Sequence, residues 1–186
     1  MPTTWNPSDK GSNITLSNGN LTVTLTAGNE YNSVRATVYK ASGKWYWENT
    51  IQGQSGGIPG VGIATASANL ATYIGADQYG WCWLNNGNVY NSGSVVASIG
   101  AFTVGDVLGV AFDADNHTIK FYKNNTLKGT VSSLPSSDFY PTATVHNALP
   151  YDQITANFGA STLAYTPPSG YTPLDGISFK PQIMIF

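Results

Sequence analysis

The stretch of sequence that decides the fold is residues 105–124, which read GDVLGVAFDADNHTIKFYKN. Two segments in which every second residue is apolar, residues 107–112 and 118–123, flank a short run of turn-forming residues. The side chains expected to face one common core are Val110, Phe112, Ile119 and Phe121. This pattern predicts a long β-hairpin, with a third strand following residues 127–129.

The same alternation recurs along the rest of the chain. In residues 20–26, Leu21, Val23 and Leu25 share one face and threonines share the other, which is typical of a half-buried strand. Further strands are expected at residues 34–39, 44–51, 61–64, 81–84, 142–145 and 154–158. No stretch has the caps and the 3.6-residue period of a helix. Many short strands separated by turns predict an antiparallel β-sandwich or barrel.

Composition indicates one folded domain and excludes several classes of function. The chain has 186 residues, of which 41% are hydrophobic, and this is enough for one core. The net charge is −2 and the eight Lys and Arg residues are scattered, so no basic patch is available for a nucleic acid. No run approaches the roughly 18 apolar residues of a membrane helix. We therefore expect no nucleic-acid partner, no membrane insertion and no signal peptide in this chain.

The residues that could carry chemistry form no catalytic pattern. His117 and His146 lie outside the zinc-binding His-Glu-x-x-His motif and the Gly-x-Ser-x-Gly elbow. Cys82 stands between two tryptophans with no basic neighbour to lower its pKa, so we interpret it as a buried structural residue. Glu30 and Glu48 lack the paired carboxylates of glycoside hydrolases. We expect a protein that is not an enzyme, with no catalytic residues, metal or cofactor.

Several motifs occur in the order of a known family. They are Ser42-Gly43-Lys44-Trp45-Tyr46-Trp47-Glu48, Val61-Gly62-Ile63-Ala64, Tyr79-Gly80-Trp81, the hairpin of residues 105–124, Tyr140-Pro141, Asn157-Phe158-Gly159, and Pro167-Pro168-x-Gly170-Tyr171-x-Pro173-Leu174. Together these motifs resemble the SPRY domain, the smaller relative of the B30.2 module, over about residues 35–174. The resemblance implies an all-β fold, a bent antiparallel β-sandwich of two sheets of the SPRY or concanavalin-like jelly-roll type.

The resemblance also implies a non-catalytic binding module. In the family, a protein or peptide ligand docks on loops at one end of the sandwich. Carried over position by position, the ligand-binding residues would be Tyr31, Tyr79, Val145, His146 and Asn147.

Two other functions stay open at this point. Tyrosine and tryptophan rings stack on sugars as readily as on peptides, so the domain could be a lectin-like module that binds bacterial surface glycan. Asn85, Asn86, Asn88 and Asn91 beside Tyr90 form one polar and aromatic loop of the kind that would suit a glycan. The third possibility is an architectural domain of a virion, without a ligand of its own.

The end of the chain departs from the family pattern. We expect residues 1–174 to form the sandwich and residues 175–186 to be a C-terminal extension. The extension resembles the Gly-x-x-Phe-x-Pro start of a module that follows SPRY domains in bacteriophage structural and tail-associated proteins, although it could equally add a strand to this sandwich. We therefore expect part of a phage virion or tail-associated protein, located in the virion or outside the cell, with neighbouring virion subunits as further partners.

Overall fold

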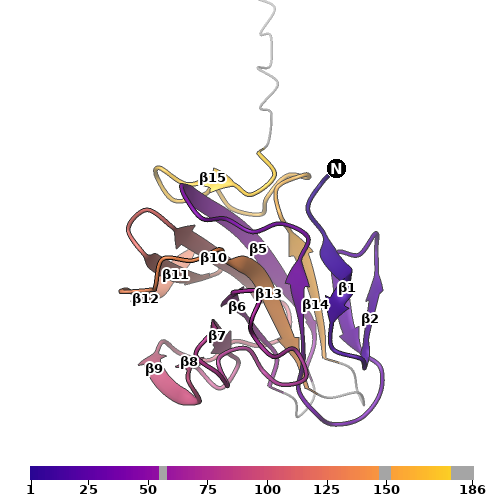
Figure 1. The fold of residues 1–186 in the computed structure, drawn as a ribbon. Helices are drawn as coiled ribbons and strands as arrows, with labels where there is room; N and C mark the ends of the chain where they lie inside the picture. Colours follow the sequence, from indigo (N-terminus) through magenta and orange to yellow (C-terminus); the bar gives the residue numbers. More distant parts are fainter. Residues whose placement is uncertain (55–57, 147–151, 177–186) are drawn as a thin grey trace, which may run out of the picture.

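Two β-sheets packed face to face make up the structure (Figure 1), a computed structural model that describes residues 1–54, 58–146 and 152–176. The first sheet has the order β1 (Trp5–Lys10), β4 (Asn32–Ala36), β13 (Tyr140–Val145), β6 (Gly60–Ala64), β7 (Gly80–Leu84), β8 (Asn88–Asn91) and β9 (Ser94–Ser98). The second has the order β12 (Thr126–Val131), β11 (Thr118–Lys123), β10 (Val107–Asp113), β5 (Lys44–Gly53), β14 (Gln153–Asn157), β3 (Thr22–Leu25) and β2 (Ile14–Ser17). These strands pair antiparallel, and β15 (Thr172–Pro173) adds a short parallel pairing to β5. The predicted antiparallel sandwich of two sheets is confirmed.

The predicted hairpin is formed by β10 and β11. Val110 lies opposite Phe121 and Phe112 lies opposite Ile119, and all four side chains are buried in one core. A third strand, β12, pairs with β11 as predicted, but it begins at Thr126 and contains residues 127–129 instead of following them.

Five strands were not predicted from the sequence, namely β1, β2, β8, β9 and the two-residue β15. The expected loop around Tyr90 is wrong in part, because Asn88–Asn91 forms β8 and pairs with both β7 and β9. Asparagine and serine are poor strand formers, and this hairpin is held at the edge of the sheet by Val89, which is fully buried.

Tryptophan and phenylalanine rings fill the space between the sheets. The Trp83 ring lies 5.0 Å from Phe102 and 5.8 Å from Phe121, each edge-on, so it joins the two sheets. Asn49 is the polar exception, because alternation along β5 places it between Trp47 and Ile51 on the core side. It is fully buried, and within the described residues its side-chain amide has no hydrogen-bond partner.

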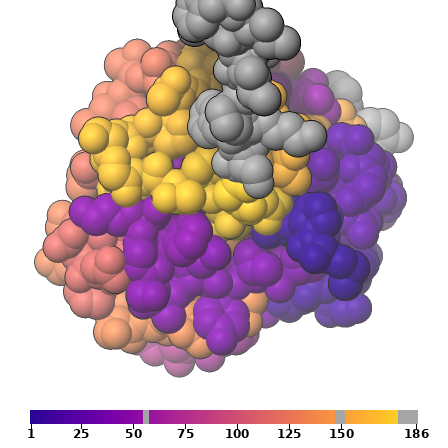
Figure 2. Space-filling model, turned by 90° about the horizontal axis from the view of Figure 1, so that it is seen from above, coloured from indigo at the N-terminus to yellow at the C-terminus, as the bar shows by residue number. Residues whose placement is uncertain are grey.

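The opposite face of β5 is buried as well, beneath the C-terminal segment. The Glu48 carboxylate accepts hydrogen bonds from the backbone N–H groups of Ala164 at 2.7 Å and Tyr165 at 2.9 Å. Leu163 packs there against Tyr46 in a separate apolar cluster. Figure 2 shows this segment, in yellow, covering one end of the molecule. Glu48, the acidic residue of the Trp-Tyr-Trp-Glu motif, therefore attaches the chain's last described segment to the sandwich.

The first and last described residues meet at one corner of the sandwich. The backbone N–H of Thr3 donates to both carboxylate oxygens of Asp175 at 3.0 Å, and the Thr3 hydroxyl donates to the same group. The Leu174 N–H donates to the Tyr46 carbonyl at 3.0 Å. Residues 177–186, most of the expected extension, lie outside the described residues, so the proposed boundary after residue 174 stays a prediction.

Candidate functional site

A long loop, residues 65–79, covers the outer face of the first sheet. Beneath it lies a second apolar cluster of Ala64, Ala68, Ile74, Cys82 and Leu84. The loop is bonded to the strands it covers, since Ser33 Oγ donates to the Thr72 carbonyl at 2.7 Å and the Ile74 N–H donates to Thr144 Oγ1 at 3.2 Å. This outer face is therefore a packed layer and not a bare sheet.

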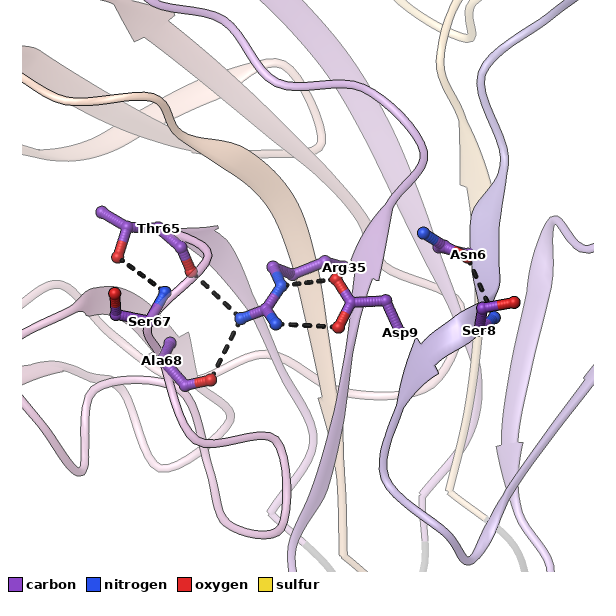
Figure 3. Close-up of polar contacts among 7 residues, drawn as sticks. All are labelled: Asn6, Ser8, Asp9, Arg35, Thr65, Ser67 and Ala68. Atoms are coloured by element: carbon purple, nitrogen blue, oxygen red, sulfur yellow. Dashed lines mark hydrogen bonds and ion pairs between the residues drawn. The ribbon is translucent and has the colours of Figure 1, made fainter.

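Arg35, the chain's single arginine, fixes the start of this loop. Figure 3 shows its guanidinium between the Asp9 carboxylate and the carbonyl oxygens of Thr65 and Ala68. The bonds to Asp9 measure 2.7 and 2.8 Å and are bidentate, while both carbonyls accept from Nη1 at 3.0 Å. The N–H groups of a guanidinium lie in one plane at fixed angles, so a single arginine can bind the carboxylate and both carbonyl oxygens at once. Arg35 is thus committed to structure and is not free to bind a ligand.

Four aromatic rings form a continuous row at one end of the first sheet. His146 lies 4.2 Å from Tyr31, Tyr31 lies 5.1 Å from Tyr73, and Tyr73 lies 5.7 Å from Tyr90, measured between ring centroids. The rings come from the end of β13, the start of β4, the long loop and β8. Each is half-buried, so each keeps part of its ring at the surface. We call this set the aromatic row.

Hydrogen bonds and burial fix the polar groups of the aromatic row. The backbone N–H of His146 donates to Asp152 Oδ2 at 2.9 Å, and Asn86 Nδ2 donates to the Tyr90 hydroxyl at 3.0 Å. Burial raises the pKa of Tyr31, and the neighbouring Tyr73 and Tyr90 raise it further. Tyr31 is therefore neutral at physiological pH, and it can act as a hydroxyl donor or acceptor within an aromatic surface.

The structure brings together only part of the predicted binding set. Tyr31 and His146 are in contact, as the resemblance implied. Val145 is the exception at this end, because its side chain is fully buried in the core and does not reach the surface expected for it. Val145 is the last residue of β13 and pairs with Asn32, the first residue of β4, and alternation directs its side chain inward. Asn147 lies outside the described residues.

Tyr79 lies at the opposite end of the first sheet. It precedes β7, whose Gly80 pairs with Ala64, and Ala64 pairs with Tyr140 at the start of β13. His146 follows the other end of β13, six residue steps after Tyr140, and this separates the two ends by about 20 Å. The expectation of one surface that contains both Tyr79 and His146 is therefore wrong for this fold.

Two members of the aromatic row, Tyr73 and Tyr90, were absent from the predicted set. Tyr73 stands in a loop whose path over the sheet no local pattern reveals. Tyr90 was noted only as part of an asparagine-rich loop. The alternation Val89-Tyr90 after Trp83 was the available signal, because it predicts an added strand with Tyr90 on the outer face.

Residues weighed for chemistry have structural roles here. Cys82 is fully buried, and burial raises the pKa of its thiol to about 12. Asp113 Oδ1 accepts from the Asn116 N–H at 3.0 Å, a local side-chain bond that closes the turn of the hairpin. Within the described residues, no group of three or more His, Cys, Asp and Glu side chains is placed to hold a metal ion, and no helix is long and apolar enough to cross a bilayer.

Comparison with known proteins gives one matching family model, that of the SPRY domain, over residues 44–161. F-box/SPRY domain-containing protein 1 of Drosophila mojavensis is 26% identical over 152 residues, covering 74% of this chain and 60% of the relative. Ran-binding protein 9 of Xenopus tropicalis is 30% identical over 173 residues, covering 88% of this chain and 31% of the relative. The chain thus spans less than two thirds of either relative.

Solved structures show the same fold. The SPRY domain of human HERC1 matches with a TM-score of 0.72 at 19% identity, covering 85% of this chain and 99% of that one. Stonustoxin matches with a TM-score of 0.69 at 20% identity, covering 84% of this chain and 27% of that one. The two sequence relatives named above are animal proteins, so they give no support to the expected phage context.

Proposed function

Because this chain belongs to the SPRY domain family, whose members are typically protein–protein interaction modules, we propose that it is a non-catalytic module that binds a protein or peptide at the aromatic row. The observation that carries the proposal is the convergence of Tyr31, Tyr73, Tyr90 and His146 from four separate segments onto one end of the sheet. Half-buried aromatic rings offer a large contact area with few rotors to immobilise, which suits them as binding anchors.

The chemistry of the aromatic row favours a peptide with an apolar side chain flanked by polar backbone groups. The rings present apolar faces, while the hydroxyl groups of Tyr31 and Tyr73 can exchange hydrogen bonds with a backbone. No lysine or arginine stands in this row, and the single arginine is paired with Asp9. A phosphorylated or strongly acidic ligand would therefore lack its usual partner.

The test is selection of binders from a random peptide display library against the full chain, followed by affinity measurement on variants. We expect Tyr31→Ala to weaken binding about 30-fold, because removal of a central aromatic anchor typically costs about 2 kcal/mol. Tyr31→Phe keeps the ring and should lose much less. Tyr79→Ala, at the other end of the sheet, should bind as the unchanged chain does. Selected peptides that bind equally well to Tyr31→Ala and His146→Ala would overturn the proposal.

The virion or extracellular location is a separate proposal. It is supported by the low charge, 10% of residues, and by the resemblance of residues 175–186 to a phage module. Detection of the chain in purified virus particles from its source would support the location. Detection only in the cell fraction would contradict it.

A further inference from the structure

A groove of about 550 Å³ lies at the end of the first sheet that is opposite the aromatic row. One wall is made by the two ends of the long loop, with Thr65, Ser67, Gln78 and Tyr79. The other wall is residues 135–138, which lead into β13 and end with Asp138. We call this the Tyr79 groove.

The first wall of the Tyr79 groove is held by a hydrogen-bond network. The Thr65 N–H donates to the Tyr79 carbonyl at 2.8 Å, so the two ends of the loop are tied together. Asp77 accepts from the backbone N–H of Tyr79 at 2.9 Å. The Arg35 guanidinium binds the Thr65 carbonyl from beneath (Figure 3). This wall is therefore built independently of any ligand.

The second wall is anchored in the core. Phe139 is buried directly after Asp138, and its ring packs edge-on against Trp81 at 5.7 Å and Phe112 at 5.5 Å. Its backbone exchanges hydrogen bonds with Lys40. A groove with two fixed walls loses little conformational freedom when a ligand enters, which favours binding.

The lining of the groove combines the apolar surfaces of Tyr79, Ala66 and Pro135 with uncharged polar groups. Tyr79 is 39% exposed, and among the described tyrosine, tryptophan and phenylalanine residues only Tyr39 is more exposed. Ser67, Gln78, Ser136 and Asp138 are exposed around it. Among the described residues that line the groove, none is a lysine, arginine or histidine, and Asp138 is the one charged side chain.

This combination selects for an uncharged ligand rich in hydroxyl groups. A sugar ring presents C–H groups that can stack on the face of Tyr79, and hydroxyl groups that can donate to Asp138 and exchange bonds with Gln78 and the serines. A phosphate or carboxylate would meet the Asp138 charge with no cation to offset it. A long apolar side chain would find no deep apolar pocket.

We propose that the Tyr79 groove is a second binding site and that its ligand is a neutral saccharide. The length of β13 separates this site from the aromatic row. The domain can therefore bind a peptide at one end of the first sheet and a saccharide at the other. The proposal does not depend on the peptide site.

The test is a titration of the isotope-labelled full chain with a panel of neutral oligosaccharides, followed by amide NMR spectra, after screening on a glycan array. We expect saturable shifts at residues 65–67, 78–80 and 135–138. Tyr79→Ala should weaken binding at least about tenfold through the lost stacking face, and Tyr79→Phe should stay within about threefold. Asp138→Asn should weaken it by a similar tenfold where a sugar hydroxyl donates to the carboxylate.

The matched control is Tyr39→Ala, which removes a tyrosine of comparable exposure, 49%, whose ring lies tilted against that of Tyr140 and does not line the groove. Its saccharide affinity should be unchanged, as should that of Tyr31→Ala. Thermal melts of every variant would show whether the fold is kept. Three results would each overturn the proposal: no binding across the array, amide shifts confined to the aromatic row, or binding of library peptides but of no saccharide in the Tyr79 groove.

Discussion

Replacement of Asp9 by alanine would leave the Arg35 guanidinium without its counter-charge beneath the long loop. The Arg35 side chain is 8% exposed and that of Asp9 is 30% exposed, so the cation is the more deeply buried partner. The carbonyl oxygens of Thr65 and Ala68 would remain as acceptors, but they neutralise no charge. A buried cation that has lost its anion is one of the few single changes that destabilise a domain strongly.

The size of the effect follows from the two exposures. Removal of one partner of a fully buried ion pair costs about 3–5 kcal/mol. Because nearly a third of Asp9 faces solvent, screening reduces this figure, and we expect Asp9→Ala to lower the free energy of unfolding by about 2–3 kcal/mol. For a domain of this length the melting temperature should fall by about 4–12 °C.

The assay is urea unfolding followed by tryptophan fluorescence, arranged as a double-mutant cycle with Arg35→Met. Once the cation is absent, Asp9→Ala should cost less than about 0.5 kcal/mol. Glu30→Ala, which removes an exposed carboxylate, is the control and should change nothing. Equal costs of Asp9→Ala in both backgrounds, or a cost below 0.5 kcal/mol in the unchanged chain, would refute the reasoning that the pair acts as one buried unit.

Three further predictions concern stability. Asn49→Leu should raise the free energy of unfolding by about 1–2 kcal/mol in urea titration, because it removes a buried amide with no partner among the described residues. Gly62→Ala should lower it by about 2–3 kcal/mol in the same assay, because an added Cβ would meet the Trp81 carbonyl oxygen at 1.9 Å. Acid should destabilise the domain, as thermal melts across pH would show. Burial opposes the ionisation of Asp106 and Asp113. Hydrogen bonds from Thr103 and Asn124 to Asp106, and from Asn116 and Lys44 to Asp113, nevertheless lower the pKa of each carboxyl below 3.8.

Each of these has an outcome that would contradict it. Because folding lowers the pKa of both carboxyl groups, the stability that they contribute is fully present above the ordinary value of 3.8 and is lost as the pH falls through the lowered values. A melting temperature that stays constant down to pH 2 would contradict the acid prediction. Asn29→Leu, at an exposed position, is the control for Asn49→Leu, and an equal effect of both would count against the buried amide. A stable Gly62→Ala would show that β6 and β7 can move apart.

The central strands and their pairing were predictable because each carries a strong alternation. In β10 and β11 the apolar residues fall on every second position, and burial of one face leaves a single register. The strand predicted at residues 34–39 is shifted, since β4 ends at Ala36 and Tyr39 is exposed. The short strand β1 was missed because WNPSDK contains a proline and no alternation, and its pairing with β4 is irregular.

The site was harder to predict because a sequence does not show at which end of a sheet a loop lies. Tyr79 and His146 both flank strands of the first sheet, yet β7 begins at the end where β13 also begins, and His146 follows the far end of β13. The family resemblance predicted Tyr31 and His146 as binding residues, and their rings are in contact. Tyr73 depended on the path of a loop that is fixed by Arg35 and Thr144, two contacts distant in sequence.

The bond between Thr3 and Asp175 has a consequence for any longer polypeptide that contains this sandwich. The chain would enter and leave the domain at one corner. Regions before and after the domain would therefore start close together and not on opposite sides of the sandwich. Such a geometry tolerates insertion into a loop of another domain.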